Sequence, residues 1–212
     1  MNGTELSSLT KTRIKLCGLT RPEDIEAVNE WQPDYIGFVF AKNSRRYVTG
    51  ERAAELKKAL HPGIRAVGVF VREEPEIVAG LLNEGIIDLA QLHGGEDEEY
   101  IRRLRGLTDR PLIKAFRMEE TPIEEIRNST ADLVLLDSGS GGTGSVFDWN
   151  LLKEVERPYF LAGGLGLENI CEAVRMWKPF GVDVSSGIET EGVKDREKIK
   201  QFVCSVRDAE SE

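Results

Sequence analysis

Residues 13–40, RIKLCGLTRPEDIEAVNEWQPDYIGFVF, indicate how the chain folds. A short apolar run, RIKLCG, is followed by the amphipathic charged run RPEDIEAVNEW and then by a second apolar run, DYIGFVF. Pro22 stands in the first turn of the charged run, a position that proline favours in helices. The stretch therefore predicts a strand, a helix and a second strand.

The same alternation continues to the last residues of the chain and makes eight strand–helix units. The expected strands are residues 13–18, 34–40, 64–71, 87–94, 110–117, 132–138, 157–164 and 181–187. The expected helices are residues 21–31, 50–60, 75–85, 96–107, 121–129, a short one at 148–155, 167–177 and 195–208. The strands are apolar at nearly every position, which is typical of parallel strands buried on both faces.

Eight consecutive units favour the α/β class and a single-domain (β/α)8 TIM barrel over residues 13–209. Residues 1–12 read as a polar N-terminal extension, without the apolar run of a signal peptide. An open, doubly wound sheet is the alternative, because counting strands does not establish that the sheet closes.

Composition narrows the class of partner. The net charge is −9 and no long basic cluster occurs, so we expect no nucleic-acid partner. No apolar run approaches the roughly 20 residues of a membrane helix, so we expect no membrane partner. The three cysteines are far apart and only two histidines are present, so we expect no disulfide framework and no metal site. This cysteine usage fits a cytoplasmic location.

In a barrel of this type the catalytic groups come from the C-terminal ends of the strands. The first expected strand ends at Cys17 and Gly18, the fourth at QLHGGE with His93, and the sixth at Asp137. The second runs into AKNSRRYV, which contains an arginine pair. We therefore expect a thiol, an imidazole, a carboxylate and an arginine to share one rim.

The last two strand ends predict a phosphate site. AGGLG contains Gly163 and Gly164, and SSG comprises Ser185, Ser186 and Gly187. Glycine turns let backbone N–H groups approach an anion, and barrel enzymes often bind phosphate with the loops after strands seven and eight. Either turn alone would be read as a tight connection, whereas the two together favour phosphate binding.

The loop GSGGTG after Asp137 matches G-x-G-x-x-G through Gly139, Gly141 and Gly144. A dinucleotide site needs this pattern in the first βα turn, an immediate helix and an acidic residue at the end of the next strand. None of these is present, and no lysine follows as in a P-loop. The loop is instead interpreted as an active-site lid.

Cys17 and Asp137 are the candidate chemical pair. A thiol whose pKa is lowered can serve as a base, and a carboxyl group that stays protonated can serve as an acid. Taken singly, each has a simpler reading: Cys17 as a small buried hydrophobe and Asp137 as a turn residue.

Six collinear motifs resemble the phosphoribosylanthranilate isomerase family of tryptophan biosynthesis. They are KLCGLTRPED, GFVFAKNSRRYV, QLHGGE, LLDSGSGGTG with FDW, LAGGL with ENI, and GVDVSSGIE with GVKD, between Lys15 and about Phe202. The resemblance implies an Amadori rearrangement of N-(5-phosphoribosyl)anthranilate, a small phosphosugar, without a cofactor or a metal.

The resemblance also implies residue roles. Cys17 would be the general base and Asp137 the general acid. Arg46 would contact the anthranilate carboxylate or nearby substrate, and His93 would line the substrate. In the glycine loop, the substrate-binding residues would be Gly142, Thr143 and Gly144. The two glycine turns already identified would bind the phosphate. The protein is expected to be a monomer or a weak homodimer.

Two positions depart from the family pattern. Ser145 stands where a basic residue usually follows GGTG, and Gly166 stands where a polar helix cap usually follows GGL, although glycine is an acceptable N-cap. Two other functions stay open: the related histidine-pathway isomerase, against which Cys17 argues, and a binding module without catalysis, against which Cys17 and Asp137 together argue.

Overall fold

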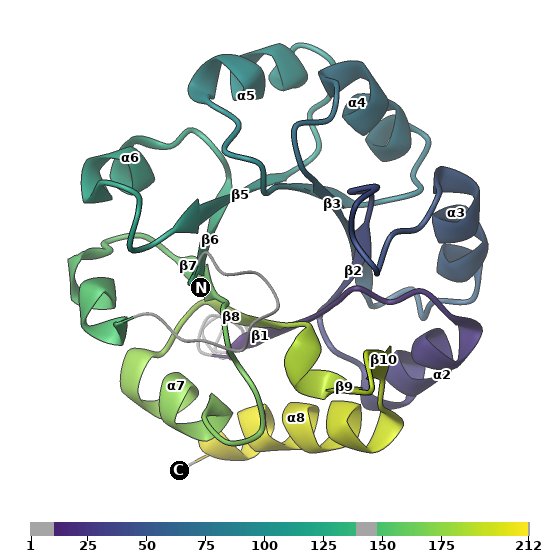
Figure 1. Cartoon of the computed structure of the whole chain (residues 1–212), viewed down its shortest axis with the longest axis vertical. Helices are drawn as coiled ribbons and strands as arrows, with labels where there is room; N and C mark the ends of the chain where they lie inside the picture. Colours follow the sequence, from purple (N-terminus) through teal and green to yellow (C-terminus); the bar gives the residue numbers. More distant parts are fainter. Residues whose placement is uncertain (1–10, 139–147, 212) are drawn as a thin grey trace, which may run out of the picture.

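The computed structural model describes residues 11–138 and 148–211, and in it eight parallel strands form one closed barrel in chain order (Figure 1). The strands are β1 (Arg13–Cys17), β2 (Tyr35–Val39), β3 (Arg65–Phe70), β4 (Leu89–Leu92), β5 (Leu112–Arg117), β6 (Leu133–Asp137), β7 (Tyr159–Leu161) and β8 (Gly181–Val184). The predicted (β/α)8 barrel is confirmed, and the open sheet is wrong because β8 pairs with β1.

Helices surround the barrel on the outside (Figure 1). They are α2 (Pro22–Trp31), α3 (Gly50–Lys58), α4 (Pro75–Asn83), α5 (Glu98–Arg105), α6 (Ile123–Asn128), α7 (Ile170–Trp177) and α8 (Arg196–Ala209). The short helix expected near residue 150 is the 3-10 helix η1 (Trp149–Glu154). No helix among the described residues is long and apolar enough to cross a membrane.

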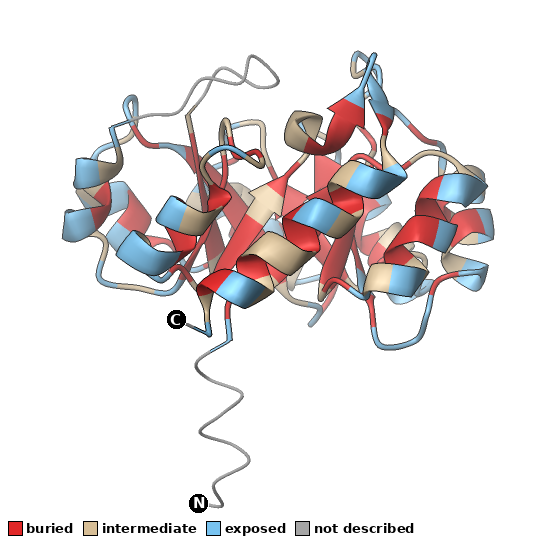
Figure 2. Ribbon diagram, turned by 90° about the horizontal axis from the view of Figure 1, so that it is seen from below, coloured by how far each residue is buried: buried red, intermediate tan, exposed pale blue. Residues whose placement is uncertain are grey.

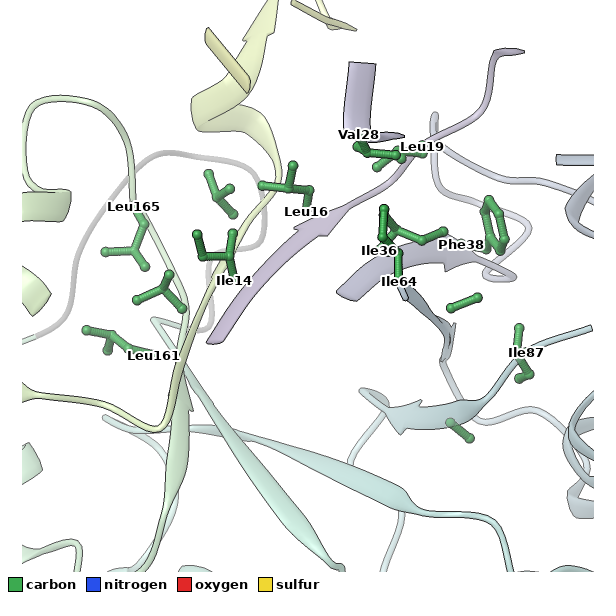
Figure 3. Packing of buried hydrophobic residues seen from close by; sticks show 14 of the residues in the cluster. Ile14, Leu16, Leu19, Val28, Ile36, Phe38, Ile64, Ile87, Leu161 and Leu165 are labelled. Carbon is green, nitrogen blue, oxygen red and sulfur yellow. The ribbon is translucent and has the colours of Figure 1, made fainter. Parts of the chain in front are cut away.

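The alternation of side chains along each strand divides the apolar interior into two parts. One part includes Ile14 and Leu16 of β1 together with helix residues such as Val28, and it fills the space between barrel and helices (Figure 3). The other contains no helix residue and fills the barrel lumen, where the Phe160 ring packs edge-on against Tyr35 with centroids 5.6 Å apart. Figure 2 accordingly shows buried strands inside helices whose outer faces are exposed.

The segment between β8 and α8 differs from the simple strand–helix unit that the sequence predicts. A 3-10 helix, η2 (Ser186–Ile188), follows β8, and β9 (Glu189–Thr190) and β10 (Val193–Lys194) then form an antiparallel hairpin. Viewed down the barrel, this hairpin lies outside the ring of strands, beside α8 and α2 (Figure 1). Because each of its strands has two residues, no periodicity could reveal it.

Asp34, just before β2, joins three elements at the N-terminal end of the barrel. Its carboxylate accepts a hydrogen bond from Arg13 of β1 at 2.7 Å, one from the Ile14 amide at 2.9 Å, and one from Arg207 of α8 at 3.0 Å. Burial alone would raise the pKa of Asp34, but these bonds outweigh it and the pKa lies below its ordinary value. The ionised carboxylate therefore joins the start of β2 to the first strand and the last helix.

Replacing Asp34 with Asn should lower the free energy of unfolding at pH 7 by about 1–3 kcal/mol, because charged hydrogen bonds are lost. A depressed carboxyl pKa contributes stability above the unfolded pKa of about 3.9 and loses it as the pH falls through the folded pKa. The deficit should therefore shrink below about pH 4. Urea titrations at pH 7 and pH 3.5 measure it. Asp208→Asn, at an exposed residue of α8, is the control. A deficit equal at both pH values would contradict the role of the charge.

Candidate active site

A cavity of about 320 Å³ opens at the C-terminal ends of the strands. The predicted site residues that line it come from four strand ends and two loops: Cys17, Arg46, His93, Asp137, Gly163, Gly164, Ser185 and Ser186. Gly187 supports this wall from behind, since a Cβ there would lie 2.1 Å from the Leu165 oxygen. The predicted loop residues Gly142, Thr143 and Gly144 lie outside the described residues. One concave site thus gathers side chains that are far apart in sequence.

Cys17 ends β1 with its thiol toward the lumen, and Gly37 on β2 makes room for it. The two residues are neighbours in the parallel register, and a Cβ on Gly37 would lie 2.6 Å from Cys17 Sγ. Burial raises the pKa of the Cys17 thiol above its ordinary value, although attraction to the Lys15 ammonium opposes that rise. A lowered thiol pKa is therefore not what the structure shows for Cys17.

Asp137 ends β6 and is bonded to His93, which follows β4. His93 Nε2 lies 3.1 Å from Asp137 Oδ2, and His93 Nδ1 lies 2.9 Å from the amide nitrogen of Gln91. With the Gln91 amide nitrogen facing Nδ1, the ring proton is on Nε2 and is donated to the Asp137 carboxylate. His93 is therefore a partner of Asp137 as well as a lining residue of the cavity.

Arg46 reaches the cavity with its guanidinium held by Glu189 of the β9–β10 hairpin. Arg46 Nε and Nη2 donate to the two carboxylate oxygens at 2.6 and 2.8 Å, and Lys194 Nζ donates to Oε1 at 2.6 Å. Burial tends to raise the pKa of Glu189, but the bonds from Arg46 and Lys194 bring it below its ordinary value. The ionised Glu189 thus fixes the direction of Arg46 while leaving its Nη1 group free of this bidentate pair.

The two glycine turns lie side by side at one wall. Gly163 and Gly164 both have positive φ, 79° and 66°, and a Cβ on Gly163 would lie 2.7 Å from Asp137 Oδ1. The Ser185 hydroxyl donates to the Cys17 carbonyl at 3.0 Å, and Lys194 Nζ donates to the Ser185 carbonyl at 2.8 Å. The expected phosphate residues are therefore adjacent to both members of the Cys17 and Asp137 pair.

The helix behind the first turn starts later than predicted. α7 begins at Ile170 with Asn169 at the N-cap, so the expectation that Gly166 caps it is wrong. The Asn169 amide accepts a hydrogen bond from the Gly166 N–H and donates one to the Gly164 oxygen, both at 2.9 Å. Asn169 therefore stabilises the glycine turn from within the loop.

Within the described ranges, 11–138 and 148–211, no group of three or more histidine, cysteine, aspartate or glutamate side chains could hold a metal ion.

A family model described as N-(5'-phosphoribosyl)anthranilate (PRA) isomerase matches residues 14–205, which is most of the chain. The chain belongs to this family. It is accordingly an enzyme, an isomerase, as its resemblance in sequence predicted.

Relatives and solved structures agree with the family assignment. The N-(5'-phosphoribosyl)anthranilate isomerase of Endomicrobium trichonymphae is 45% identical over 199 residues, covering 92% of this chain and 98% of that protein. The crystal structure of phosphoribosyl anthranilate isomerase from Thermus thermophilus has a TM-score of 0.84 and 34% identity, over 93% of this chain and 99% of that one. Another solved isomerase, in complex with reduced 1-(o-carboxyphenylamino)-1-deoxyribulose 5-phosphate, has a TM-score of 0.79 and 35% identity, with the same coverage.

Several side chains at this isomerase-family site were not identified from the sequence. They are Lys15, Gln91, Asp183, Glu189 and Lys194, each of which contacts a predicted residue or lines the cavity. Lys15 and Asp183 carried a signal, because each is a charged residue inside an apolar strand run. Glu189 and Lys194 lie in two of the motifs that carry the family resemblance, but their role depends on a hairpin that the sequence pattern does not predict.

Gly37→Ala should destabilise the protein by about 1–3 kcal/mol, because the added methyl group overlaps the Cys17 thiol in a packed lumen. The free energy of unfolding is measured by urea titration. Gly80→Ala is the matched control: Gly80 lies in α4 with open space around its Cα, so alanine should add about 0.5–1 kcal/mol of stability there. Equal effects of the two changes would show that Gly37 is not required by the thiol.

Proposed function

We propose that this protein catalyses the Amadori rearrangement of N-(5-phosphoribosyl)anthranilate to 1-(2-carboxyphenylamino)-1-deoxyribulose 5-phosphate in tryptophan biosynthesis. The observation that carries this proposal is one cavity in which Cys17, Asp137 and two adjacent glycine turns meet, in a chain of this isomerase family. A phosphate on the turns would hold the sugar between the thiol and the carboxyl group. The substrate is thus positioned for acid and base chemistry at two neighbouring carbons.

Asp137 acts as the general acid in the first step. It donates a proton to the furanose ring oxygen while the bond from that oxygen to C1′ breaks, which leaves a protonated Schiff base between C1′ and the anthranilate nitrogen. The proton is carried on Oδ1, the carboxyl oxygen on the side of the Gly163 turn, where it can be presented to the substrate. Oδ2 meanwhile accepts the hydrogen bond from His93 Nε2, whose Nδ1 faces the Gln91 amide nitrogen. The His93 tautomer therefore stays the same whether or not Asp137 carries its proton.

Cys17 acts as the general base in the second step. Its thiolate takes the proton from C2′, the electrons of that C–H bond form the C1′–C2′ double bond, and the positive charge on nitrogen is neutralised. The resulting enolamine becomes the 2-keto product when C1′ gains a proton and the C2′ hydroxyl loses one. No group outside the protein and the substrate is needed for this balance, so we propose no cofactor.

We assign the negatively charged groups of the substrate to cationic or N–H groups of the protein. Arg46 faces the cavity with its orientation fixed by Glu189 and is the cation available to the anthranilate carboxylate. The Ser185–Gly187 turn and the pair Gly163 and Gly164 provide backbone N–H groups for the phosphate. Gly142, Thr143 and Gly144 are further proposed substrate-binding residues. We further propose a cytoplasmic monomer or weak homodimer, which sedimentation over a range of concentrations distinguishes.

Cys17→Ala and Asp137→Asn should each lower kcat by at least roughly 100-fold, the size of a general acid or base contribution. The assay follows the loss of phosphoribosylanthranilate fluorescence with the substrate made in situ. Cys171→Ala, on α7, and Asp109→Asn, at an exposed loop residue, are the matched controls and should keep parental turnover. Near-normal turnover in either site variant would remove that residue from the mechanism. A parent protein that is inactive in this assay would exclude the proposed reaction.

Arg46→Ala should raise KM at least tenfold with a smaller change in kcat, because it removes a substrate contact rather than the acid or the base. Steady-state kinetics separate the two constants. Arg45→Ala is the control: Arg45 shares the Glu189 carboxylate at 3.0 Å but does not line the cavity, so KM should stay within about twofold. An unchanged KM in Arg46→Ala would contradict the assigned contact.

A further inference from the structure

A buried lysine lies in the lumen of the barrel, which is lined mainly by apolar side chains. The side chain of Lys15 is completely inaccessible to solvent, and it is among the largest fully buried side chains of the described residues. The neighbouring lumen positions are filled by residues such as Val67, Ile113 and Phe160. A charged group in such surroundings is costly unless it is paired, so its retention calls for a role.

The position of Lys15 follows from the strand register. Lys15 and Cys17 are two residues apart on β1, so both side chains point to the same, inner face of the barrel. On the adjacent strand β8, Asp183 is the register partner of Lys15. Lys15 Nζ donates to Asp183 Oδ1 at 2.9 Å, and Cys17 lies on the same inner face of β1, close enough for the Lys15 ammonium to attract its thiolate. The ammonium therefore lies beside both the Asp183 carboxylate and the Cys17 thiol.

These contacts keep the lysine charged. Burial alone would lower the pKa of Lys15, but attraction to Asp183 and Cys17 outweighs it and the pKa lies above its ordinary value. For Cys17 burial has the larger effect: it raises the thiol pKa more than the Lys15 ammonium lowers it. Asp183 opposes the thiolate by repulsion, but less strongly than Lys15 favours it. The Lys15 ammonium is thus the group that most favours the charged form of Cys17.

Two other cations face the thiol from other elements. Lys194 of β10 lowers the Cys17 pKa to a smaller extent than Lys15. Arg46, from the loop after β2, also interacts electrostatically with Cys17, but its guanidinium is paired with Glu189. Both approach from the mouth of the barrel, whereas Lys15 lies beneath the thiol in the lumen.

We propose that Lys15, held by Asp183, is a positioning residue that stabilises the thiolate of Cys17 and so makes this base available for proton abstraction. The inference rests on the proposed function, in which Cys17 is the base. Lys15 keeps its own protons throughout. The thiol proton leaves to solvent before the substrate reacts, and the thiolate becomes a thiol again when it takes the C2′ proton.

The test measures the thiolate directly rather than the isomerase activity. The rate of Cys17 alkylation by iodoacetamide is followed from pH 6 to pH 10, with peptide mass spectrometry to separate Cys17 from Cys171 and Cys204. Lys15→Met removes the ammonium. The double variant with Asp183→Asn removes both charges, so that no buried carboxylate is left unpaired and the fold is preserved. In both variants alkylation below the midpoint should be slower than in the parent, roughly tenfold for each unit by which the midpoint rises. The slowing should be smaller in the double variant, because Asp183, which disfavours the thiolate, has also lost its charge.

Lys114→Met is the matched control. Lys114 of β5 is also a buried lysine in an ion pair, 3.4 Å from Glu125 of α6, but it faces the helices rather than the lumen. Its replacement should leave the alkylation midpoint where the parent has it. If the double variant folds and also keeps the parental midpoint, Lys15 serves packing alone and the inference is overturned. Full turnover by Cys17→Ala would instead overturn the assignment of Cys17 as the base, and an inactive parent would overturn the proposed reaction, whatever the alkylation profile shows.

Discussion

The parallel pairing of β8 with β1 joins the two ends of the sheet and leaves no free edge in the barrel. Closure gives every strand an inner and an outer face, both of which are buried. It also fixes the register in which Lys15 lies beside Asp183, while the pairing of β1 with β2 places Cys17 beside Gly37. Lys15 shares β1 with the thiol and Gly37 lies on the adjacent β2, whereas Asp183 comes from β8, so the carboxylate that pairs with Lys15 is in place only when the barrel is closed. At the N-terminal end of the barrel, the Asp34 contacts with Arg13 and Arg207 join the start of β2 to β1 and α8.

Desolvation is the main electrostatic influence at the site. It raises the pKa of Cys17 and would lower that of Lys15, and in the lumen it is offset only by short, specific contacts. The same balance holds at the mouth of the barrel, where the buried Glu189 carboxylate is paired with both Arg46 and Lys194. A packed barrel can therefore carry charged groups where each has a partner at hydrogen-bonding distance.

The sequence predicted much of the site because barrel geometry relates chain position to place. A residue at the end of a strand reaches the C-terminal rim, so Cys17, His93 and Asp137 could be assigned to one site before any coordinates were known. The hydrogen bonds between these side chains could not be predicted in this way. His93 was expected to line the substrate, but its bond to Asp137 depends on the side-chain directions of β4 and β6. Glu189 was missed because a two-residue strand has no detectable period.

The alternation of apolar strands with amphipathic helices determined the class of fold, and six short motifs determined the family to which the chain belongs. These are local properties, written in consecutive residues. The tertiary structure alone decided that the sheet closes and that the absence of a side chain at Gly37 leaves room for the Cys17 thiol. It also decided that Lys15, two residues before Cys17, pairs with Asp183 from the far end of the chain. Those relations depend on the register of β1 with both of its neighbours, β2 and β8, and register is set by the packing of the whole barrel rather than by any one segment.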